Sequence, residues 1–366
     1  MKNTFGTSVC VTVFGESHGS AIGAVIDGIC PGITVDEEKI KNALSKRRPS
    51  SDTDTARVEK DNFEILSGVF NGKTTGTPIC IVIKNENTRS TDYEATRYLA
   101  RPSHADYTSF CKYHGYEDYR GGGHFSGRIT AAIVAAGAVL SGALENIGIK
   151  IGTHILKCAG VYDRAFSDAR SDIEVLKDRN FPVLSDCETK MTEKILKARS
   201  DGDSVGGVVQ TAVCGMPCGV GEPWFDSIES TLSHILFSVG GVKGVEFGSG
   251  FALADMKGSE ANDAFCMKDG KIITKTNHNG GINGGITNGM DIIFNCAIKP
   301  TASIYSEQDT VDMSKNENAK LVIKGRHDPA IVRRACPVID AVTAIAICDM
   351  VAQRYGTDVF SKGEKL

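Results

Sequence analysis

Runs of apolar residues interrupted by polar positions predict a series of β-strands spread along the whole chain. The runs are rich in Val, Ile and Phe, whose side chains favour the extended backbone of a sheet, and several alternate in part between apolar and polar positions. The predicted strands are residues 8–14, 79–84, 205–214, 244–254, 290–299 and 321–324.

Other segments carry the signals of α-helices. Residues 37–47 follow Asp36, a favourable N-cap, and residues 128–145 are Ala-rich and apolar nearly all round, which predicts a buried helix. Asp226 and Glu229 resemble a capping box that opens a helix to residue 237. The remaining predicted helices are residues 187–199, which are amphipathic, and residues 338–354, with Pro337 in the first turn.

These helices and strands do not alternate regularly, which argues against a doubly wound parallel sheet and favours an α+β fold with antiparallel sheets. No Pro/Ser-rich linker or low-complexity tract divides the chain, so we expect residues 1–366 to form a single domain. Residues 161–203 are rich in charge and are predicted to form a solvated excursion from the core.

The composition is that of a globular protein, because 41% of the 366 residues are hydrophobic and 23% are charged. The formal net charge of -4 argues against nucleic acid as a partner. The apolar run at residues 129–140 is too short to span a bilayer, so we expect no membrane association. The 12 cysteines form no Cys-x-x-Cys pair and are expected to be reduced thiols in a cytoplasmic protein.

Five segments rich in Gly, Ser or Arg each contain a histidine. Loops of this composition gain little from burial, but they carry function when a rigid scaffold holds them in place. We therefore treat all five as candidate site segments, and their histidines are His18, His104, His124, His278 and His327.

Two well-known chemistries fit these segments poorly. No His-x-x-x-His or His-Glu-x-x-His pattern stands on a predicted helix, so no metal site is expected. Ser17 lies in a Gly-x-Ser-x-Gly pattern, but the strand before it is short and no triad partners follow in the chain order of an α/β-hydrolase. Acyl transfer is therefore the weaker alternative.

Arginines in or beside the same segments indicate the class of ligand. A guanidinium group binds carboxylate or phosphate through two parallel hydrogen bonds. If several converge, their mutual repulsion requires a multiply charged anion between them. For Arg47 and Arg48 there is also a structural interpretation, because the end of a helix favours positive charge.

Two further turns are suited to holding an anion or a cofactor. Residues 121–123 are all glycine and precede the predicted buried helix, so their backbone N–H groups could bind a phosphate. They form neither a Walker A loop nor a dinucleotide fingerprint. Residues 299–303 follow a predicted strand and are rich in hydroxyl groups.

These motifs resemble those of the chorismate synthases and occur in the order of that family, from Gly15 to the helix predicted to end near Arg354. They are Gly-Glu-Ser-His-Gly at residues 15–19, Arg-Pro-Ser-His-Ala-Asp at 101–106, Gly-Gly-Gly-His-Phe-Ser-Gly-Arg at 121–128, Val-Lys-Gly-Val-Glu at 242–246, His-Asn-Gly-Gly-Ile at 278–282, Lys-Pro-Thr-Ala-Ser at 299–303 and Gly-Arg-His-Asp-Pro at 325–329.

The resemblance implies a lyase of the shikimate pathway of aromatic amino acid biosynthesis, which converts 5-enolpyruvylshikimate 3-phosphate to chorismate and phosphate. This 1,4-anti elimination needs reduced FMN although no net oxidation occurs, because the C–H bond that breaks is not acidic. The resemblance also implies a homotetramer, with helices sandwiched between antiparallel β-sheets in each subunit.

By the same resemblance, His104 would protonate the leaving phosphate, His18 would donate to the reduced flavin and Asp328 would assist the final removal of a proton. Ser17 and Ser126 would support these groups through hydrogen bonds. The implied FMN-binding residues are His124, Phe125, Ser126, Gly240, Gly241, Gly284, Lys299, Pro300, Thr301, Ala302, Ser303 and Arg326.

The implied binding residues for the anionic groups of the substrate, or for NADPH where a member reduces its own flavin, are Arg47, Arg48, Arg101 and Arg128. Two positions depart from the family pattern. Many relatives have Arg-Ser-Ser where this chain has His124-Phe125-Ser126, and many have Arg at the position of Thr53. The first change removes a fixed positive charge near the flavin, and the second puts a nucleotide site in doubt.

Two other classes of function stay open at this point. One is a flavin oxidoreductase that consumes NADPH, although the sequence has no dinucleotide fingerprint. The other is a non-catalytic protein that binds a phosphorylated metabolite, in which His18 and His104 have no chemical role.

Overall fold

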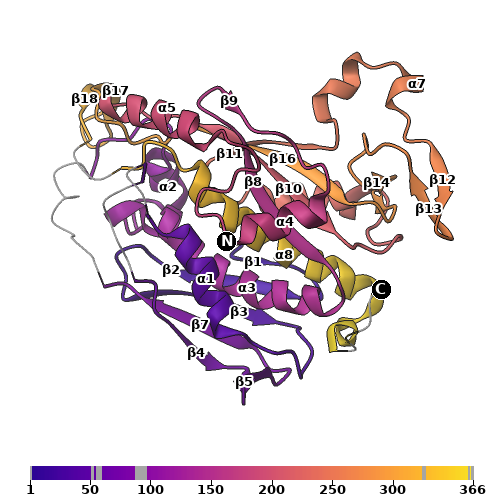
Figure 1. Ribbon diagram of the computed structural model, residues 1–366. Helices are drawn as coiled ribbons and strands as arrows, with labels where there is room; N and C mark the ends of the chain where they lie inside the picture. The colour runs from indigo at the N-terminus through magenta and orange to yellow at the C-terminus, as the bar shows by residue number, and fades with distance from the viewer. Residues whose placement is uncertain are drawn as a thin grey trace.

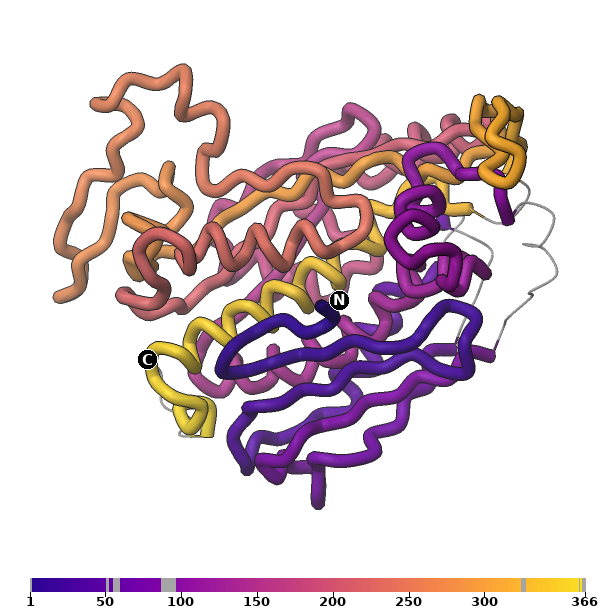
Figure 2. Tube along the Cα trace, turned by 180° about the vertical axis from the view of Figure 1, so that it is seen from behind, coloured from indigo at the N-terminus to yellow at the C-terminus, as the bar shows by residue number. Residues whose placement is uncertain are grey.

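The structure is a computed structural model that describes residues 2–50, 53–54, 60–86, 97–323, 327–361 and 363. Two five-stranded antiparallel sheets enclose a layer of helices (Figures 1 and 2), which confirms the predicted α+β fold. The first sheet has the order β1 (Thr4–Phe5), β2 (Cys10–Gly15), β3 (Ala21–Asp27), β7 (Ile79–Lys84), β4 (Phe63–Ser67). The second has the order β11 (Val242–Phe247), β16 (Ile292–Ile298), β10 (Gly207–Cys214), β8 (Lys150–Cys158), β9 (Val161–Tyr162).

The helical layer is two helices deep, since α3 packs on the first sheet, α8 packs on the second, and the two contact each other. The helices are α1 (Glu37–Arg47), α2 (Asp106–Tyr113), α3 (Thr130–Asn146), α4 (Ala169–Lys177), α5 (Glu188–Ser200), α6 (Ile228–Leu236), α7 (Gly258–Ala261) and α8 (Val332–Tyr355). Short 3₁₀ turns are η2 (Arg120–Phe125), η3 (Gly127–Ile129), η4 (Trp224–Asp226), η5 (Gly250–Asp255) and η6 (Thr357–Ser361).

Four two-stranded ribbons complete the fold. They are β5 (Val69–Phe70) with β6 (Lys73–Thr74), β12 (Phe265–Lys268) with β13 (Lys271–Thr274), β14 (Ile282–Asn283) with β15 (Ile286–Thr287), and β17 (Gln308–Asp312) with β18 (Glu317–Leu321). In Figure 1, α7 and β12–β13 form an arm that extends away from the second sheet.

Small residues let the two central helices approach closely. A methyl group added to Gly137 of α3 would overlap the backbone and side chain of Ala341 in α8. The helical stretch Gly127–Asn146, formed by η3 and α3, and helix α8 are both long and apolar enough to cross a membrane by length and composition, but 72% and 94% of their most apolar windows are buried inside the protein. Their apolar character is explained by their place between the sheets.

The sequence predicted some elements closely. The α1 and β7 bounds agree with the prediction, and Asp36 caps α1 by accepting hydrogen bonds from the backbone N–H groups of Glu38 and Lys39. The predicted cap of α6 was wrong, because Ser227 and not Asp226 accepts from the backbone of Ser230.

Two predicted boundaries at the C-terminal end of the chain were also wrong. Helix α8 begins at Val332, so Pro337 lies inside it, and ion pairing of Arg333 with Asp54 holds the early turn in place. The strand predicted at residues 321–324 lies at Glu317–Leu321 instead, because the side chain of Asp312 accepts from the backbone of Ser314 and fixes the turn of the β17–β18 ribbon.

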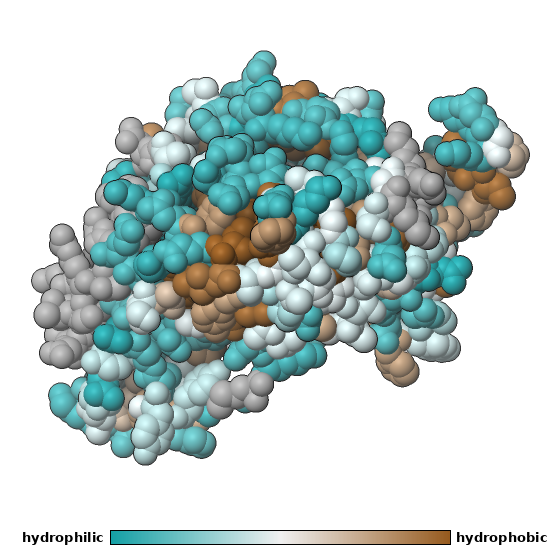
Figure 3. All heavy atoms as spheres, turned by 90° about the horizontal axis from the view of Figure 1, so that it is seen from below, coloured by the Kyte–Doolittle hydropathy of each residue, from teal (hydrophilic) through white to brown (hydrophobic). Residues whose placement is uncertain are grey.

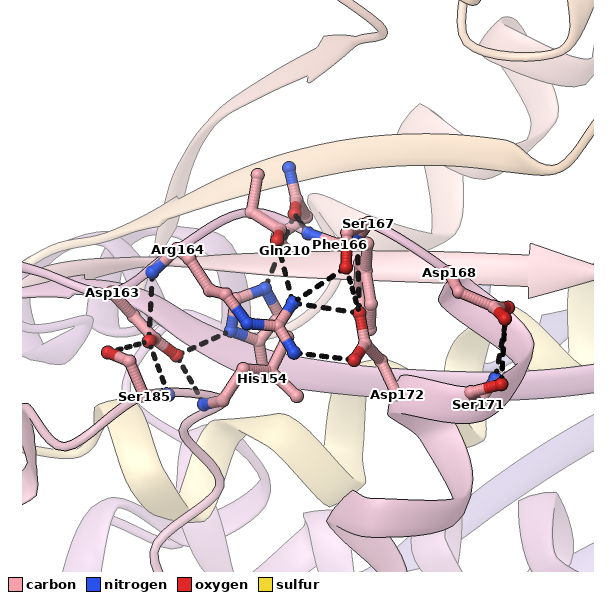
Figure 4. Close-up of polar contacts among 12 residues, drawn as sticks. His154, Asp163, Arg164, Phe166, Ser167, Asp168, Ser171, Asp172, Ser185 and Gln210 are labelled. Carbon is pink, nitrogen blue, oxygen red and sulfur yellow. Dashed lines mark hydrogen bonds and ion pairs between the residues drawn. The ribbon is translucent and has the colours of Figure 1, made fainter.

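The predicted solvated excursion at residues 161–203 is packed onto the second sheet. Ile173 of α4 is buried against the sheet, where Gly152 leaves room for it. A polar network ties this segment down (Figure 4), with Arg164 paired to Asp172 and Phe166 donating its backbone N–H to the Gln210 side chain. Part of the charge of the segment is therefore used in internal contacts, whereas the charged residues of α5 are exposed.

Candidate functional site

The glycine turn of η2 is the point at which three of the predicted site segments meet. Gly121, Gly122 and Gly123 all have positive φ angles, of 58°, 82° and 53°. The carbonyl oxygen of Gly123 accepts from the backbone N–H of Ser17, and Nδ1 of His124 donates to the carbonyl oxygen of Gly15 at 2.7 Å. These bonds join the loop after β2 to the turn that precedes α3.

His18 packs directly on this turn. A methyl group added to Gly121 would overlap the His18 ring at Cε1 and Nδ1, and it would lie 2.9 Å from the hydroxyl of Ser17. Both residues are buried, and the Ser17 Oγ atom has no hydrogen-bond partner among the residues that the structure describes. An unpartnered buried hydroxyl is costly, which indicates that a ligand group or water completes it.

His104 contacts the next residue of the same turn. A methyl group added to Gly122 would lie 3.3 Å from Cε1 and 3.7 Å from Nε2 of His104, and 3.8 Å from Nη2 of Arg101. Consecutive Cα atoms are only about 3.8 Å apart, so the two imidazoles flank neighbouring residues of one turn. The structure thus brings the two predicted histidines together.

A carboxylate holds His104 and Arg101 in place. Asp106, at the start of α2, accepts from Nε and Nη2 of Arg101 at 2.8 and 2.7 Å and lies 3.0 Å from Nδ1 of His104. Burial raises the pKa of Asp106, but the hydrogen bonds from Arg101 and His104 outweigh it and hold that pKa well below its usual range. Sequence reasoning assigned no role to Asp106, although it stands in the His104 motif.

The turn after β16 lies against the same cluster. Lys299 donates from Nζ to the carbonyl oxygen of Ser103, and its backbone N–H donates to Gly241 at 2.9 Å. Burial lowers the pKa of Lys299, with Lys243 acting in the same direction. Of the predicted flavin residues, Lys299 therefore links Gly241 to the His104 loop, and Gly240, Pro300, Thr301, Ala302 and Ser303 are chain neighbours of these two residues.

Gly284 does not join this group. It is exposed in the turn between β14 and β15, and Gly280, just before β14, accepts from the backbone N–H of Ile293 at the Ile292 end of β16. Lys299 follows the other end of this seven-residue strand. Because a strand rises about 3.3 Å per residue, roughly 20 Å separate the two ends.

The predicted anion-binding arginines lie mostly behind the glycine turn, in ion pairs with the protein's own carboxylates. Asp61 is buried between Arg47 and Arg128 and accepts from both. Burial lowers the pKa of Arg47 to about 10, although the Asp61 charge opposes this shift. Arg48 donates to the backbone of Lys60. Nothing in the sequence around Asp61 indicated this pairing, which depends on three segments meeting in space.

The segment around Asp328 lies next to the Arg47–Asp61–Arg128 cluster and within electrostatic range of Arg101. Asp328 accepts from Nη1 of Arg334 at 2.6 Å, and Arg334 also donates to the backbone of Arg47. The neighbouring His327 has no partner for its buried Nε2 among the described residues. Burial and the charge of Arg101 lower the pKa of His327, so Arg101 lies within electrostatic range of it. The predicted residue Arg326 lies outside the described residues.

The remaining predicted residues support the turn itself. The hydroxyl of Ser126 accepts from the backbone N–H of Arg128 at 3.3 Å and caps η3. Phe125 is partly exposed, with its ring edge-on to Tyr113. Within the described part of the chain, no group of three or more His, Cys, Asp or Glu side chains is placed to hold a metal ion.

Comparison with known proteins gives a consistent result. The profile of the chorismate synthase family matches residues 9–352. The chain is 46% identical over 346 residues to the chorismate synthase of Pyrococcus abyssi, covering 94% of this chain and 96% of the relative. It is 45% identical over 350 residues to that of Methanosarcina mazei, covering 95% of each chain. A solved structure titled "Crystal Structure of Chorismate Synthase" superposes with a TM-score of 0.77 at 27% identity, covering 98% of this chain and 97% of the other.

Proposed function

The chain belongs to the chorismate synthase family, a family of lyases, and from this premise we propose that it converts 5-enolpyruvylshikimate 3-phosphate to chorismate and phosphate with the help of reduced FMN. The observation that carries the proposal is the convergence of His18 and His104 on Gly121 and Gly122, with Arg101 beside them. Proton donors and a guanidinium around one open turn suit the loss of phosphate from a trianionic ring.

The residues around the turn fit an FMN site. The hydroxyls of Ser17 and Thr301 are buried and lack partners among the described residues. A methyl group at Gly240 would meet no atom within 4 Å, so the backbone there is open to a ligand. We assign FMN binding to the 124–126 segment, to Gly240 and Gly241, and to the 299–303 turn. When bound, reduced FMN supplies electron density as phosphate leaves and recovers it with the hydrogen.

The protein's part in this reaction is to hold and move protons. His104 donates a proton to the departing phosphate oxygen, a transfer suited to an imidazole whose ordinary pKa lies near neutrality. His18, which packs on Gly121 beside the Gly122 contact of His104, holds a proton that it can donate to the cofactor. Asp328 accepts the last proton. Ser17 supports the turn through its backbone N–H, which donates to the carbonyl oxygen of Gly123, and Ser126 supports it through its hydroxyl, which accepts from the backbone of Arg128.

Arg101 is the arginine best placed to bind a substrate anion. Its Nε and Nη2 edge is held by Asp106, and its Nη1 makes no hydrogen bond to a described residue. Arg47 and Arg128 are buried against Asp61, so they supply a positive field from behind the turn. Arg48 is partly buried, like Arg101, and donates from Nη1 to the backbone carbonyl of Lys60.

We further propose that the protein is a cytoplasmic homotetramer. Large apolar side chains are exposed on the outer face of the first sheet, at Phe14 and Leu66, on η5, at Phe251, and on the arm, at Phe265. Figure 3 shows an apolar area ringed by polar residues on the lower side of the molecule. Contiguous exposed apolar surface favours association between copies. Sedimentation at micromolar concentration should give four times the chain mass, and a monomer would contradict this.

An anaerobic assay of phosphate release tests the proposed function. Purified protein with substrate and photoreduced FMN should release phosphate and form chorismate, whereas oxidised FMN should support neither. A parallel reaction with oxidised FMN and NADPH as the only reductant asks whether the protein reduces its own flavin. Steady consumption of NADPH without phosphate release would favour a flavin oxidoreductase, and no release with reduced FMN would reject the proposal.

A further inference from the structure

The Nδ1 atom of His104 lies between two groups with opposite hydrogen-bonding character. It is 3.1 Å from Nη2 of Arg101, which can only donate, and 3.0 Å from Oδ1 of Asp106, which as a carboxylate can only accept. If Nδ1 carries a proton it donates to Asp106, and if it carries a lone pair it accepts from Arg101. The two partners therefore favour opposite proton positions on the same ring.

The carboxylate is the more firmly fixed of the two partners. Asp106 accepts from the backbone N–H and Nε of Arg101 through Oδ2, at 2.9 and 2.8 Å, and from Nη2 through Oδ1 at 2.7 Å. These bonds stabilise the ionised form, as the lowered pKa of Asp106 indicates. An ionised acceptor held this way favours the Nδ1–H form of His104.

The position of this proton decides whether His104 can act as an acid. A proton that leaves Nε2 for a phosphate oxygen must leave behind a neutral imidazole, and this requires a second proton on Nδ1 throughout the step. Without the Nδ1 proton, loss of the Nε2 proton would create an imidazolate anion, which is inaccessible near neutral pH. The step balances only when one proton moves from Nε2 to phosphate and the other stays between Nδ1 and Asp106.

We propose that Asp106 is a positioning residue that keeps a proton on Nδ1 of His104, so that Nε2 can deliver its own proton to the leaving phosphate, while the same carboxylate orients Arg101. This inference rests on the role proposed above for His104. It assigns Asp106 no contact with the reacting atoms, since its effect passes through the imidazole and the guanidinium.

Asp106→Asn is the informative substitution because it keeps the shape of the side chain. The amide oxygen of Asn is expected to take the place of Oδ2, where two N–H groups of Arg101 require an acceptor. The amide NH₂ then faces Nδ1 of His104, so the ring must present a lone pair there and carry its proton on Nε2. This is the wrong tautomer for an acid that must remain neutral after it reacts.

The experiment combines turnover with ¹⁵N NMR of histidine-labelled protein, in which His104→Ala identifies the His104 signals. In the wild type, the Nδ1 signal of His104 should be that of a protonated nitrogen, and in Asp106→Asn it should move to that of a lone-pair nitrogen. Turnover of Asp106→Asn should fall by ~10²–10⁴-fold, the range for loss of a general acid. The substrate dissociation constant should change by less than about tenfold, because Arg101 keeps one oxygen partner.

A matched control separates this effect from general destabilisation. Asp172→Asn breaks another Asp–Arg pair, in which Arg164 donates from Nη1 and Nη2 at 2.9 and 2.6 Å, on α4 in the second-sheet network of Figure 4. Its turnover per folded molecule should equal that of the wild type. Equal losses in the two variants would overturn the proposal.

Two other results would also overturn it. One is wild-type turnover in Asp106→Asn, and the other is a lone-pair Nδ1 on His104 in the wild type. The second measurement needs no substrate and no Asp106→Asn protein, only the wild type with its signals assigned through His104→Ala, so it decides the proposal even if Asp106→Asn fails to fold. It also separates this inference from the proposed function, which fails only if the wild type releases no phosphate with reduced FMN.

Discussion

Two histidine–carboxylate pairs in this protein have nearly the same geometry and different surroundings. Nδ1 of His104 lies 3.0 Å from Asp106, and Nδ1 of His154 lies 3.2 Å from Asp163. His154 is fully buried, and its Nε2 lies 3.3 Å from the side-chain oxygen of Gln210 (Figure 4). His104 is partly exposed, and its Nε2 faces Gly122 without a hydrogen bond to any described residue.

The two pairs differ at Nε2 of the histidine and not at the carboxylate. In the His154 pair both ring nitrogens have partners, and Phe166 packs against the ring at 4.6 Å between centroids. Such a network leaves neither ring nitrogen available to a ligand. It joins strands β8 and β10 to the 163–166 segment. In the His104 pair, one nitrogen stays available beside an open glycine turn, which is what proton transfer to a ligand requires.

The largest effect expected from breaking either pair is on catalysis by His104. His104→Ala should lower turnover by ~10²–10⁴-fold, because the leaving phosphate loses its acid. Substrate binding should change little, since Arg101 and its Asp106 partner remain. Phosphate release at saturating reduced FMN measures this. Unchanged turnover would reject the role of His104 and remove the distinction between the two pairs.

Breaking the buried pair should affect stability and not chemistry. Asp163→Asn leaves the His154 ring without its carboxylate, and removing one partner of a buried pair costs about 3–5 kcal/mol. Denaturant unfolding measures the loss, and turnover per folded molecule should match that of the wild type. A large fall in turnover at unchanged stability would show that the second-sheet network takes part in function.

The same pair predicts a pH dependence of stability. Burial raises the pKa of Asp163, but hydrogen bonds from His154, Ser185 and backbone N–H groups hold it well below its usual range. Its contribution is therefore fully present above the ordinary Asp pKa of about 3.9 and is lost as the pH falls toward the folded-state value. In Asp163→Asn, the free energy of unfolding should fall less steeply as the pH is lowered into the acid range. An unchanged slope would show that Asp163 is not a source of the acid sensitivity.

The glycine turn provides a subtler way to disturb the site. A methyl group at Gly121 would overlap the His18 ring, and the positive φ angle disfavours Ala in any case. Displacing an imidazole by about 1 Å can cost up to about 100-fold in rate, so turnover of Gly121→Ala should fall toward that extent. Gly127→Ala is the matched control, since a methyl group there meets no atom within 4 Å. Equal activity in the two variants would contradict the packing argument.

The smallest expected effect is on substrate binding. It comes from changing Arg101, the guanidinium partner that Asp106 has and Asp163 lacks. Arg101→Lys keeps the charge but loses the two-pronged contact with Asp106 that orients Nη1, and should weaken substrate binding by about tenfold or less. Arg101→Ala should weaken it further, because a hydrogen bond to a charged group contributes about 1.5–3 kcal/mol. Calorimetric titration with substrate measures both variants. Equal losses would show that the charge of Arg101 contributes nothing once its two-pronged contact with Asp106 is lost.

How far the sequence predicted these features depends on how local their causes are. Helix α1 was predicted to the residue because its cap and its charge pattern lie within the helix itself. The start of α8 was missed because Arg333 is fixed by Asp54, which is distant in the chain. His18 and His104 could be proposed as candidates from their Gly- and Ser-rich motifs, whereas the pairing of Asp61 became visible only once the fold brought Arg47 and Arg128 around it.

A structure of the protein with FMN and substrate bound together would show whether both ligands bind at the glycine turn. We expect the two ligands to lie in contact at Gly121 and Gly122, with His104 reaching the phosphate and His18 reaching the cofactor. Ligands bound far from that turn, or imidazoles left facing solvent in the complex, would contradict it.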